Sequence, residues 1–323
     1  MESKVLGKYS FCNDEQKVGK LGCVLRVACD QEGEKVLIKS VDNELYDYVR
    51  EFELMRECKH ENVVKVLDMG KEEDGGYLVL EHLWDIREFN KDERLRYKLS
   101  KVGWIKETMR QLLVGLASLH EREVVHQDIL PECLKFELNS NNFVVKLGDF
   151  GCARKLSTPP TVHIGSLGFR APEVISKEIE KFGKGVDMWG AGVVFAVLLL
   201  GKKPFGGYRN YNLSWEEDEA KVMDKMKKLP EKDWSMKIED NDAVNLLQGL
   251  LAWDPDKRLT AAQALKSMYF RVKPQDIEEE KEVVVPMVKE EKVIASTSIF
   301  QKFIIGFIIY IILGDLCILY RHC

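Results

Sequence analysis

The chain has 323 residues, of which 45% are hydrophobic and 31% are charged, and its formal net charge is −5. This length allows about two domains, and the composition is that of a globular protein. No basic stretch is sustained, so we expect no nucleic-acid partner. The eight cysteines include no C-x-x-C pair, so neither a zinc site nor a redox motif is indicated. The first residues lack the apolar core of a signal peptide, and we expect reduced thiols in the cytosol.

The beginning of the chain reads as strands with one helix. Residues 16–29 (QKVGKLGCVLRVAC) predict two strands joined by a glycine-containing turn, and 36–39 (VLIK) is a short β-type run that ends in a lysine. A lysine in a half-buried strand is costly unless it has a partner. Residues 44–58 carry apolar side chains at helical spacing. Residues 77–83 (YLVLEHL) read as a buried strand that runs into a linker.

A long helix and three short motifs follow. Apolar residues recur at helical spacing from Trp104 to Arg122. The chain then carries H-Q-D-I-L-P-E-C at 126–133, D-F-G at 149–151 and A-P-E at 171–173. Each tripeptide alone is weak evidence, whereas the three in this order, with a lysine about 90 residues upstream, are strong evidence.

These motifs make the chain similar to the eukaryotic-type protein kinase family, over roughly residues 15–270. The resemblance implies a bilobal α+β fold, with a small β-rich lobe and hinge at 1–83 and a mostly helical lobe at 84–272. The phrase G-S-L-G-F-R-A-P-E-V, followed by D-M-W-G-A-G-V-V-F, more distantly resembles the replication-initiating kinases of the cell-division cycle. In the helical lobe the family pattern implies that Asp187 anchors the catalytic-loop backbone and that Arg258 pairs with Glu173.

The family pattern also implies a nucleotide site in the first lobe. The pattern G-x-G-x-x-G-x-V is matched at Gly19, Gly22 and Val24. Lys17 stands in place of its first glycine. Glycines here let backbone N–H groups approach phosphates without a Cβ clash. An ordinary hairpin remains the alternative. At the hinge the resemblance implies that Leu80 guards the pocket. It also implies that the backbone of Glu81 and of Leu83 hydrogen-bonds adenine.

Phosphoryl transfer needs positioned metal ions, a clamp on the phosphates and a group that orients the hydroxyl. By resemblance, Lys39 paired with Glu51 would hold the phosphates of ATP, and Glu53 is the local competitor for that pairing. The alternative for the pair is a surface lysine and a solvated helical glutamate. Asp149 would hold Mg²⁺, and Asp128 would accept the proton of the substrate hydroxyl. All of these residues are present.

Three neighbouring positions depart from the family pattern. Cys133 stands where an asparagine would bind a second Mg²⁺, a hard ion that prefers oxygen ligands. Leu130 replaces the lysine that steadies the γ-phosphate, and it supplies no charge. Gln127 replaces an arginine, so a phosphorylated activation loop lacks its usual cationic partner. Losing one preorganised contact costs about 10²–10³ in rate.

Two functions therefore compete. The first is an ATP-binding pseudokinase with weak or no phosphoryl transfer, weakened Mg²⁺ dependence and a role as a scaffold or allosteric partner of an unidentified protein. The second is an active serine/threonine protein kinase that uses one metal ion. Retention of Asp128 and Asp149 favours the second, whereas Cys133 and Leu130 favour the first.

The end of the chain predicts a membrane anchor. Residues 273–299 read as an acid-rich, solvated tether. Residues 303–320 (FIIGFIIYIILGDLCILY) are apolar apart from Asp315, and at about 1.5 Å per residue they just span a hydrocarbon core. We expect a C-terminal transmembrane helix within a tail anchor at 300–323, with the kinase-like domain facing the cytosol. A helix docked on the kinase lobe is the alternative.

Overall fold

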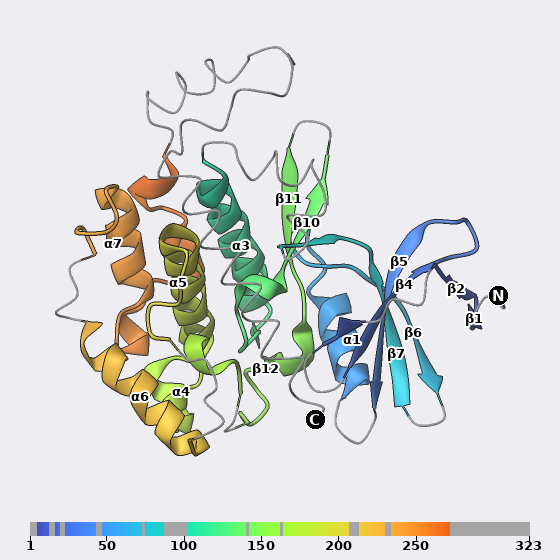
Figure 1. Cartoon of the computed structure of the whole chain (residues 1–323), viewed down its shortest axis with the longest axis horizontal. Coiled ribbons are helices and arrows are strands. Elements are labelled where there is room, and N and C mark those ends of the chain that lie inside the picture. The colour runs from blue at the N-terminus through green and yellow to red at the C-terminus, as the bar shows by residue number, and fades with distance from the viewer. Residues whose placement is uncertain are drawn as a thin grey trace, which may run out of the picture.

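A computed structural model of the chain describes residues 5–12, 17–19, 23–42, 47–72, 75–86, 103–139, 142–161, 164–206, 213–229 and 234–271. Figure 1 shows two lobes side by side, one built on strands and one mainly helical. The bilobal α+β fold expected from the motifs is therefore confirmed.

The first lobe is an antiparallel sheet in which, within the described residues, seven strands take part. Their order is β1-β2-β4-β5-β7-β6, with β3 beside β4. The strands are β1 (Val5–Leu6), β2 (Tyr9–Phe11), β3 (Lys17–Val18), β4 (Val24–Cys29), β5 (Lys35–Asp42), β6 (Val66–Glu72) and β7 (Gly75–Glu81). The predicted hairpin at 16–29 is confirmed, because Lys17 lies opposite Leu25 and Val18 opposite Val24.

Lys39 lies in the centre of this sheet. Its strand, β5, pairs with β4 on one side and with β7 on the other, so that Lys39 faces Leu25 and Leu78. The neighbouring Ile38 is fully buried on the opposite face, as the two-residue period of a strand requires. The lysine is itself 4% exposed, and burial of this kind requires a charged partner.

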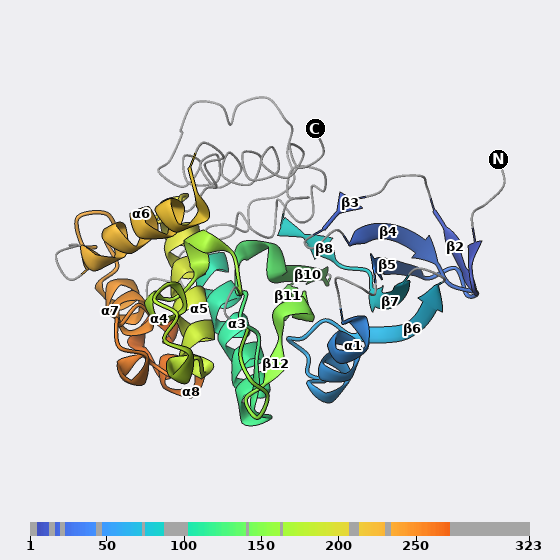
Figure 2. The ribbon, with the colours of Figure 1, turned by 90° about the horizontal axis from the view of Figure 1, so that it is seen from below.

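Helix α1 (Tyr48–Glu57) supplies that partner. The Asp47 side chain caps the helix by accepting from the N–H of Arg50 at 2.9 Å, which satisfies one of the unpaired donors of the first turn. Buried residues recur along the face that carries Glu51. Figure 2 shows α1 lying against the sheet beside β6 and β7. The carboxylate of Glu51 therefore lies inside the lobe.

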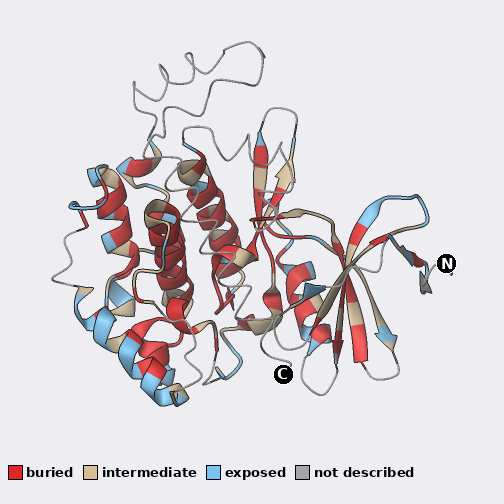
Figure 3. Cartoon of the chain, viewed as in Figure 1, coloured by how far each residue is buried: buried red, intermediate tan, exposed pale blue. Residues whose placement is uncertain are grey.

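The second lobe is organised around two long helices, α3 and α5, as Figure 1 shows. Figure 3 shows α5 buried along most of its length, whereas α6 exposes its outer side. A helix that is apolar on all sides belongs in a core, and α5 is such a helix. The helices of this lobe are α3 (Trp104–Glu121), α4 (Pro172–Ile175), α5 (Lys184–Leu200), α6 (Trp215–Lys227), α7 (Asn241–Leu250) and α8 (Ala261–Ala264).

Short strands flank the H-Q-D and D-F-G motifs where the two lobes meet. One small sheet has the order β11-β10-β8, and β9 pairs with β12 in another. The strands are β8 (Trp84–Asp85), β9 (Val124–Val125), β10 (Leu134–Leu138), β11 (Phe143–Leu147) and β12 (Arg154–Lys155). The H-Q-D motif follows β9 and the D-F-G motif lies between β11 and β12, so the pairing of β9 with β12 brings both motifs to one place.

The C-terminal transmembrane helix in the expected fold class is wrong for this structure. No helix in the described part of the chain is long and apolar enough to cross a bilayer, and the most apolar one, α5, is packed inside the second lobe. The predicted tether at 273–299 and the apolar segment at 303–320, with Asp315, lie outside the described residues. The described residues therefore form the bilobal fold. The domain boundaries and a cytosolic location stay predictions.

Candidate active site

A buried lysine pairs with carboxylates from both lobes. Lys39 Nζ donates to both carboxylate oxygens of Glu51 at 3.0 Å and to Oδ1 of Asp149 at 3.2 Å. The side chains of Lys39 and Glu51 are 5% and 1% exposed, so water screens this pair only slightly. Glu53 is exposed on α1. The structure therefore pairs Lys39 with Glu51 and brings both to the D-F-G aspartate.

The D-F-G segment is held in a constrained conformation. Asp149 has φ 65° and ψ 64°, a left-handed conformation that is uncommon outside glycine. Phe150 is fully buried and contacts the ring of His126 edge-on at 5.3 Å. The His126 ring also hydrogen-bonds the carbonyl of Gly148 at 3.0 Å. Strained backbone of this kind persists only where its surroundings enforce it, typically at functional sites.

Asp187 of α5 holds the backbone of the catalytic loop by hydrogen bonds. Its carboxylate accepts from the N–H groups of His126 at 2.8 Å and Gln127 at 2.7 Å, and from His120 Nε2 at 2.9 Å. The anchoring role expected for Asp187 is therefore confirmed. Burial alone would raise the pKa of Asp187, but the hydrogen bond and charge of His120 and the contacts with His126 outweigh it and lower that pKa.

Close packing completes this anchor. A Cβ on Gly190 of α5 would lie 2.9 Å from Cβ of Ile129, so the helix can approach the catalytic loop closely only with glycine at that position. The predicted pair of Arg258 with Glu173 is also confirmed. Arg258 Nη1 and Nη2 donate to the two carboxylate oxygens of Glu173 at 2.5 and 2.6 Å.

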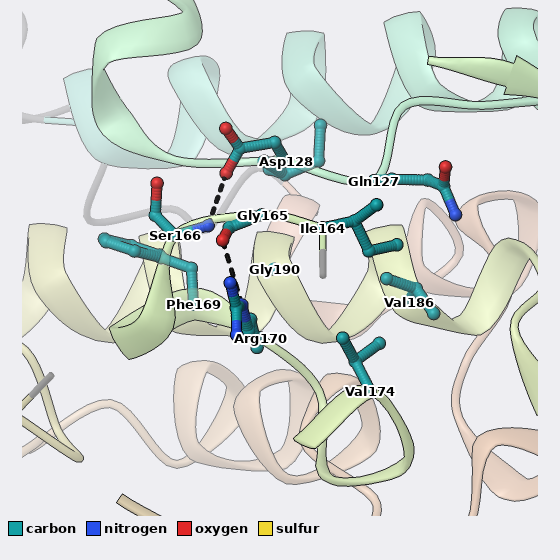
Figure 4. A pocket seen from close by; sticks show the side chains of 11 residues that line it. Gln127, Asp128, Ile164, Gly165, Ser166, Phe169, Arg170, Val174, Val186 and Gly190 are labelled. Carbon is teal, nitrogen blue, oxygen red and sulfur yellow. Dashed lines mark hydrogen bonds between the residues drawn. The ribbon is translucent and has the colours of Figure 1, made fainter. Parts of the chain in front are cut away.

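Asp128 lies beside a small hollow between the catalytic loop and residues 164–174. Its Oδ1 accepts from the N–H of Ser166 at 2.9 Å, and the carbonyl of Gly165 accepts from Arg170 Nε at 2.9 Å, as Figure 4 shows. The hollow has a volume of about 10 Å³, which is roughly the room that one water molecule needs. Its wall is mostly apolar and comes from Ile129, Ile164, Phe169, Val174 and Val186, among others. The carboxylate is thus oriented by the activation segment itself.

Leu130 and Cys133, two of the three altered catalytic-loop residues, are both buried. Leu130 is 4% exposed and Cys133 is fully buried. The Cys133 thiol donates to the backbone carbonyl of Asp128 at 3.2 Å. A thiol that donates to the loop backbone supports the shape of the loop, whereas it gives a hard cation no oxygen ligand. The contact therefore preserves the structure of the loop and not its metal chemistry.

The hinge limits how a base can be bound. Leu80 is buried, and Leu83 is partly buried against the core. The N–H of Glu81 donates to the carbonyl of Lys65 at 3.1 Å. Hydrogen bonds to adenine would therefore come from the carbonyl of Glu81 and from the backbone of Leu83. This narrows the expected backbone contacts at Glu81 to its carbonyl.

The turn after β3 is tight where it is described. The N–H of Gly19 donates to the carbonyl of Cys23 at 2.7 Å, and a Cβ on Gly19 would lie 2.4 Å from the Cys23 sulfur. Val24 begins β4 and is partly buried. Gly22 lies outside the described residues. A side chain at Gly19 would therefore displace the Cys23 sulfur from its position in this turn. The contact of Gly19 with phosphates stays a prediction.

Three cationic residues near the site were not among the residues that the sequence predicted for it. Arg50 on α1 donates to the carbonyl of Gly151 at 2.9 Å. Lys146 on β11 bridges Glu81 at 2.8 Å and Glu137 at 2.7 Å. Burial would lower the pKa of Lys146, but these two carboxylates outweigh it and raise that pKa. Its position in an otherwise apolar strand (FVVKL) was the available signal.

Arg154 is the third such residue, and it organises the activation segment. It donates to the carbonyls of Lys155 and Thr158 at 3.0 and 2.8 Å, and to that of Phe182 at 2.7 Å. Gln127, in its hydrogen-bonding amide orientation, accepts from Arg154 Nε at 3.2 Å and donates to the carbonyl of Cys152 at 3.0 Å. Neutral oxygens thus surround this buried guanidinium.

The residues fit Mg²⁺ only in part. Mg²⁺ is usually held by one or two carboxylates together with substrate phosphates and water, and Asp149 provides one carboxylate at the correct motif position. In the part of the chain that the structure describes, no cluster of three or more histidine, cysteine or acidic side chains could hold a metal ion. A metal here would therefore depend on phosphates of a bound nucleotide, with Asp149 as its protein ligand.

The lobes, the lysine–glutamate pair and the anchored catalytic loop together define a protein kinase fold and its nucleotide cleft. The chain belongs to the protein kinase family, since residues 14–270 match the protein kinase domain. It is 31% identical to serine/threonine-protein kinase MAK of Homo sapiens, over 79% of this chain and 44% of that protein. It is 28% identical to cyclin-dependent kinase 7 of Dictyostelium discoideum, over 78% of this chain and 77% of that protein.

A relative from another branch is also similar. The chain is 32% identical to calcium/calmodulin-dependent protein kinase type II alpha chain of Drosophila melanogaster, over 67% of this chain and 39% of that protein. The chain thus covers less than half of the length of MAK and of this relative. The finer resemblance to the replication-initiating kinases stays a prediction.

Proposed function

We propose that the chain is a kinase-like protein that binds ATP and transfers its phosphoryl group weakly or not at all, acting as a scaffold or allosteric partner. The phosphate clamp supports nucleotide binding: Lys39 is paired with Glu51 and lies 3.2 Å from Asp149. A lysine held in this way meets phosphates without first having to be ordered. Protein kinases as a family use ATP with Mg²⁺ and act on proteins, and the weakened metal binding belongs to this proposal.

The observation that carries the proposal is the burial of Cys133. Its thiol is fully buried and bonded to the backbone of Asp128, so its sulfur is committed to the loop. Leu130, also buried, places no charge near the γ-phosphate. Two missing electrostatic contacts, each worth about 10²–10³ in rate, leave little turnover even though Asp128 and Asp149 are present.

An active serine/threonine kinase with one metal ion is the second candidate. It is favoured by the orientation of Asp128, whose carboxylate accepts from Ser166, and by the assembled clamp at Lys39. Both candidates share nucleotide binding and differ in transfer. A binding experiment therefore tests what they share, and a transfer experiment separates them.

Nucleotide binding is measured by thermal shift with ATP, with and without Mg²⁺. At a hundredfold excess over Kd, ATP stabilises a one-site protein by about 2.7 kcal/mol, which corresponds to a rise in Tm of roughly 5–10 °C for a domain of this size. We expect a rise that depends little on Mg²⁺ and that Lys39→Met abolishes. Lys59→Met, which changes an exposed lysine on the link after α1, is the matched control and keeps the rise. No rise in the wild type under either condition would disprove nucleotide binding.

A further inference from the structure

Two cysteines meet on neighbouring strands of the first lobe, away from the site described above. The sulfurs of Cys12 and Cys29 are 2.8 Å apart. Ser10 of β2 lies directly opposite Cys29 of β4, and Phe11 opposite Ala28. Cys12 is two residues beyond Ser10, so it lies diagonally across from Cys29 on the same face of the sheet. The register therefore turns both thiols toward each other.

The pair is accessible and close to bonding distance. Cys12 is exposed and Cys29 is partly exposed, whereas Cys23, Cys58 and Cys133 are buried. A disulfide has an S–S distance of about 2.0 Å, so the two sulfurs need to approach by about 0.8 Å. Cys12 follows the last residue of β2, and Cys29 is the last residue of β4. Strand ends give the backbone room for this small adjustment.

Burial and the hydrogen bond to Cys29 raise the pKa of Cys12 to about 11, while Lys35 acts in the opposite direction. The Cys12 thiol is therefore protonated near neutral pH. Nucleophilic attack requires a thiolate, so this thiol reacts slowly with mild oxidants. The dithiol therefore needs a sustained oxidant to change state.

We propose that Cys12 and Cys29 are a redox modification site, which hydrogen peroxide converts from a dithiol to a disulfide. One thiol loses its proton and its sulfur attacks the peroxide; the O–O bond breaks, and a sulfenic acid and one water result. The second sulfur, losing its own proton, attacks the sulfenic sulfur; the S–S bond forms, the S–O bond breaks and a second water leaves. Two thiols and one peroxide thus give one disulfide and two waters.

The bond would enclose the turn of the predicted nucleotide loop. Cys12 and Cys29 are 17 positions apart, and the chain between them contains β3, Gly19 and most of β4. Closing a loop of this length restricts the unfolded chain and stabilises the folded lobe. The disulfide would therefore stiffen the β3–β4 hairpin. This inference concerns the thiols alone and does not depend on the proposed function.

The test is peptide mapping of the full chain after exposure to hydrogen peroxide. Remaining thiols are alkylated, the protein is digested without reductant, and the peptides are identified by mass spectrometry. We expect a peptide pair joined through Cys12 and Cys29, about 2 Da lighter than the sum of the two thiol peptides, which dithiothreitol separates. Cys12→Ser and Cys29→Ser each remove it, and Cys152→Ser, which changes another partly exposed cysteine, keeps it.

A second readout is the melting temperature of the same samples. Oxidised wild type should melt about 5 °C higher than reduced wild type, and the difference should vanish in Cys12→Ser. The proposal is overturned if Cys12 and Cys29 are both recovered alkylated after peroxide has oxidised Cys152. It is equally overturned if they are joined mainly to other cysteines. These readouts need no nucleotide and no activity.

Discussion

At the scale of single residues, Cys133 and Leu130 decide what the catalytic loop can do. Both are buried, and the Cys133 thiol replaces a metal ligand with a hydrogen bond to the backbone of Asp128. The rest of the loop is held firmly, because Asp187 accepts from two of its N–H groups. The geometry of the site is therefore retained, while an oxygen ligand is missing at Cys133 and a positive charge is missing at Leu130.

Restoring these two side chains should increase transfer. Cys133→Asn with Leu130→Lys supplies an oxygen ligand and a positive charge where the transition state needs them. We expect at least about a tenfold gain in phosphate transfer to a protein substrate or to the chain itself. Cys152→Ser serves as a control for loss of a thiol. Transfer no better than wild type would place the defect elsewhere, for instance at Lys17 in the glycine loop.

Asp187 gives a second prediction at this scale, about stability. Asp187→Asn removes a buried charge that three donors share, and we expect a loss on the order of 3 kcal/mol in unfolding free energy. The pKa of Asp187 is lower in the folded state. Its contribution is therefore fully present above the unfolded pKa of about 3.9 and is lost as the pH falls through the folded value.

Urea unfolding at several pH values tests this. The difference between wild type and Asp187→Asn should be constant near neutrality and should narrow below about pH 4. Asp224→Asn changes an aspartate that is 66% exposed and paired with Lys228 on the same helix, and it should cost at most about 0.5 kcal/mol. A difference for Asp187→Asn that is unchanged at low pH would contradict the anchoring role of its charge.

At the scale of elements, the activation segment is held by side chains that bind its backbone carbonyls and by an ion pair with α1. Arg154, which is 6% exposed, holds the carbonyls of residues 155, 158 and 182. Helix α1 adds Arg50, which donates to Gly151, and Glu57, which pairs with Lys155. Burial lowers the pKa of Arg154, a sign of the desolvation that these carbonyls offset. The segment and α1 therefore stabilise each other without a phosphate.

Removing the guanidinium should loosen this segment first. In Arg154→Leu the carbonyls lose their donor, and we expect amide exchange in residues 155–161 to become at least about tenfold faster, with less change in the core of α5. Hydrogen exchange measured by mass spectrometry checks this. Arg110→Leu, which changes a partly exposed arginine paired with Glu107 on α3, should leave residues 155–161 unaffected. Equal amide exchange of residues 155–161 in both variants would refute the role of Arg154 in holding this segment.

At the scale of the whole molecule, short-range patterns predicted most of the fold. The strand at 36–39, the helix at 104–122 and the hairpin at 16–29 follow from local periodicity, and the order of the motifs implied the two lobes. The family resemblance also nominated Glu51, and the structure pairs it with Lys39. These features are encoded within or between neighbouring segments.

Contacts that depend on three-dimensional packing were not predictable in this way. Arg154 and Lys146 find their partners through strand pairing and lobe contacts. The charge of Lys146 in an apolar strand is a local signal, but it does not identify those partners. Cys12 and Cys29 show no paired spacing in the sequence, yet the register of β2 with β4 brings their sulfurs together. The left-handed backbone of Gln127 and Asp149 likewise comes from the surrounding loop and not from residue type.

The central claim is that the cleft binds ATP but hardly transfers its phosphate, and transfer from γ-labelled ATP measures this most directly. Wild type and Asp149→Ala are compared under the same conditions, with Mg²⁺ present. Asp149→Ala removes the metal carboxylate, so it defines the background. We predict that wild type stays within a few-fold of that background. Transfer by wild type about a hundredfold or more above Asp149→Ala would contradict the account and establish an active kinase.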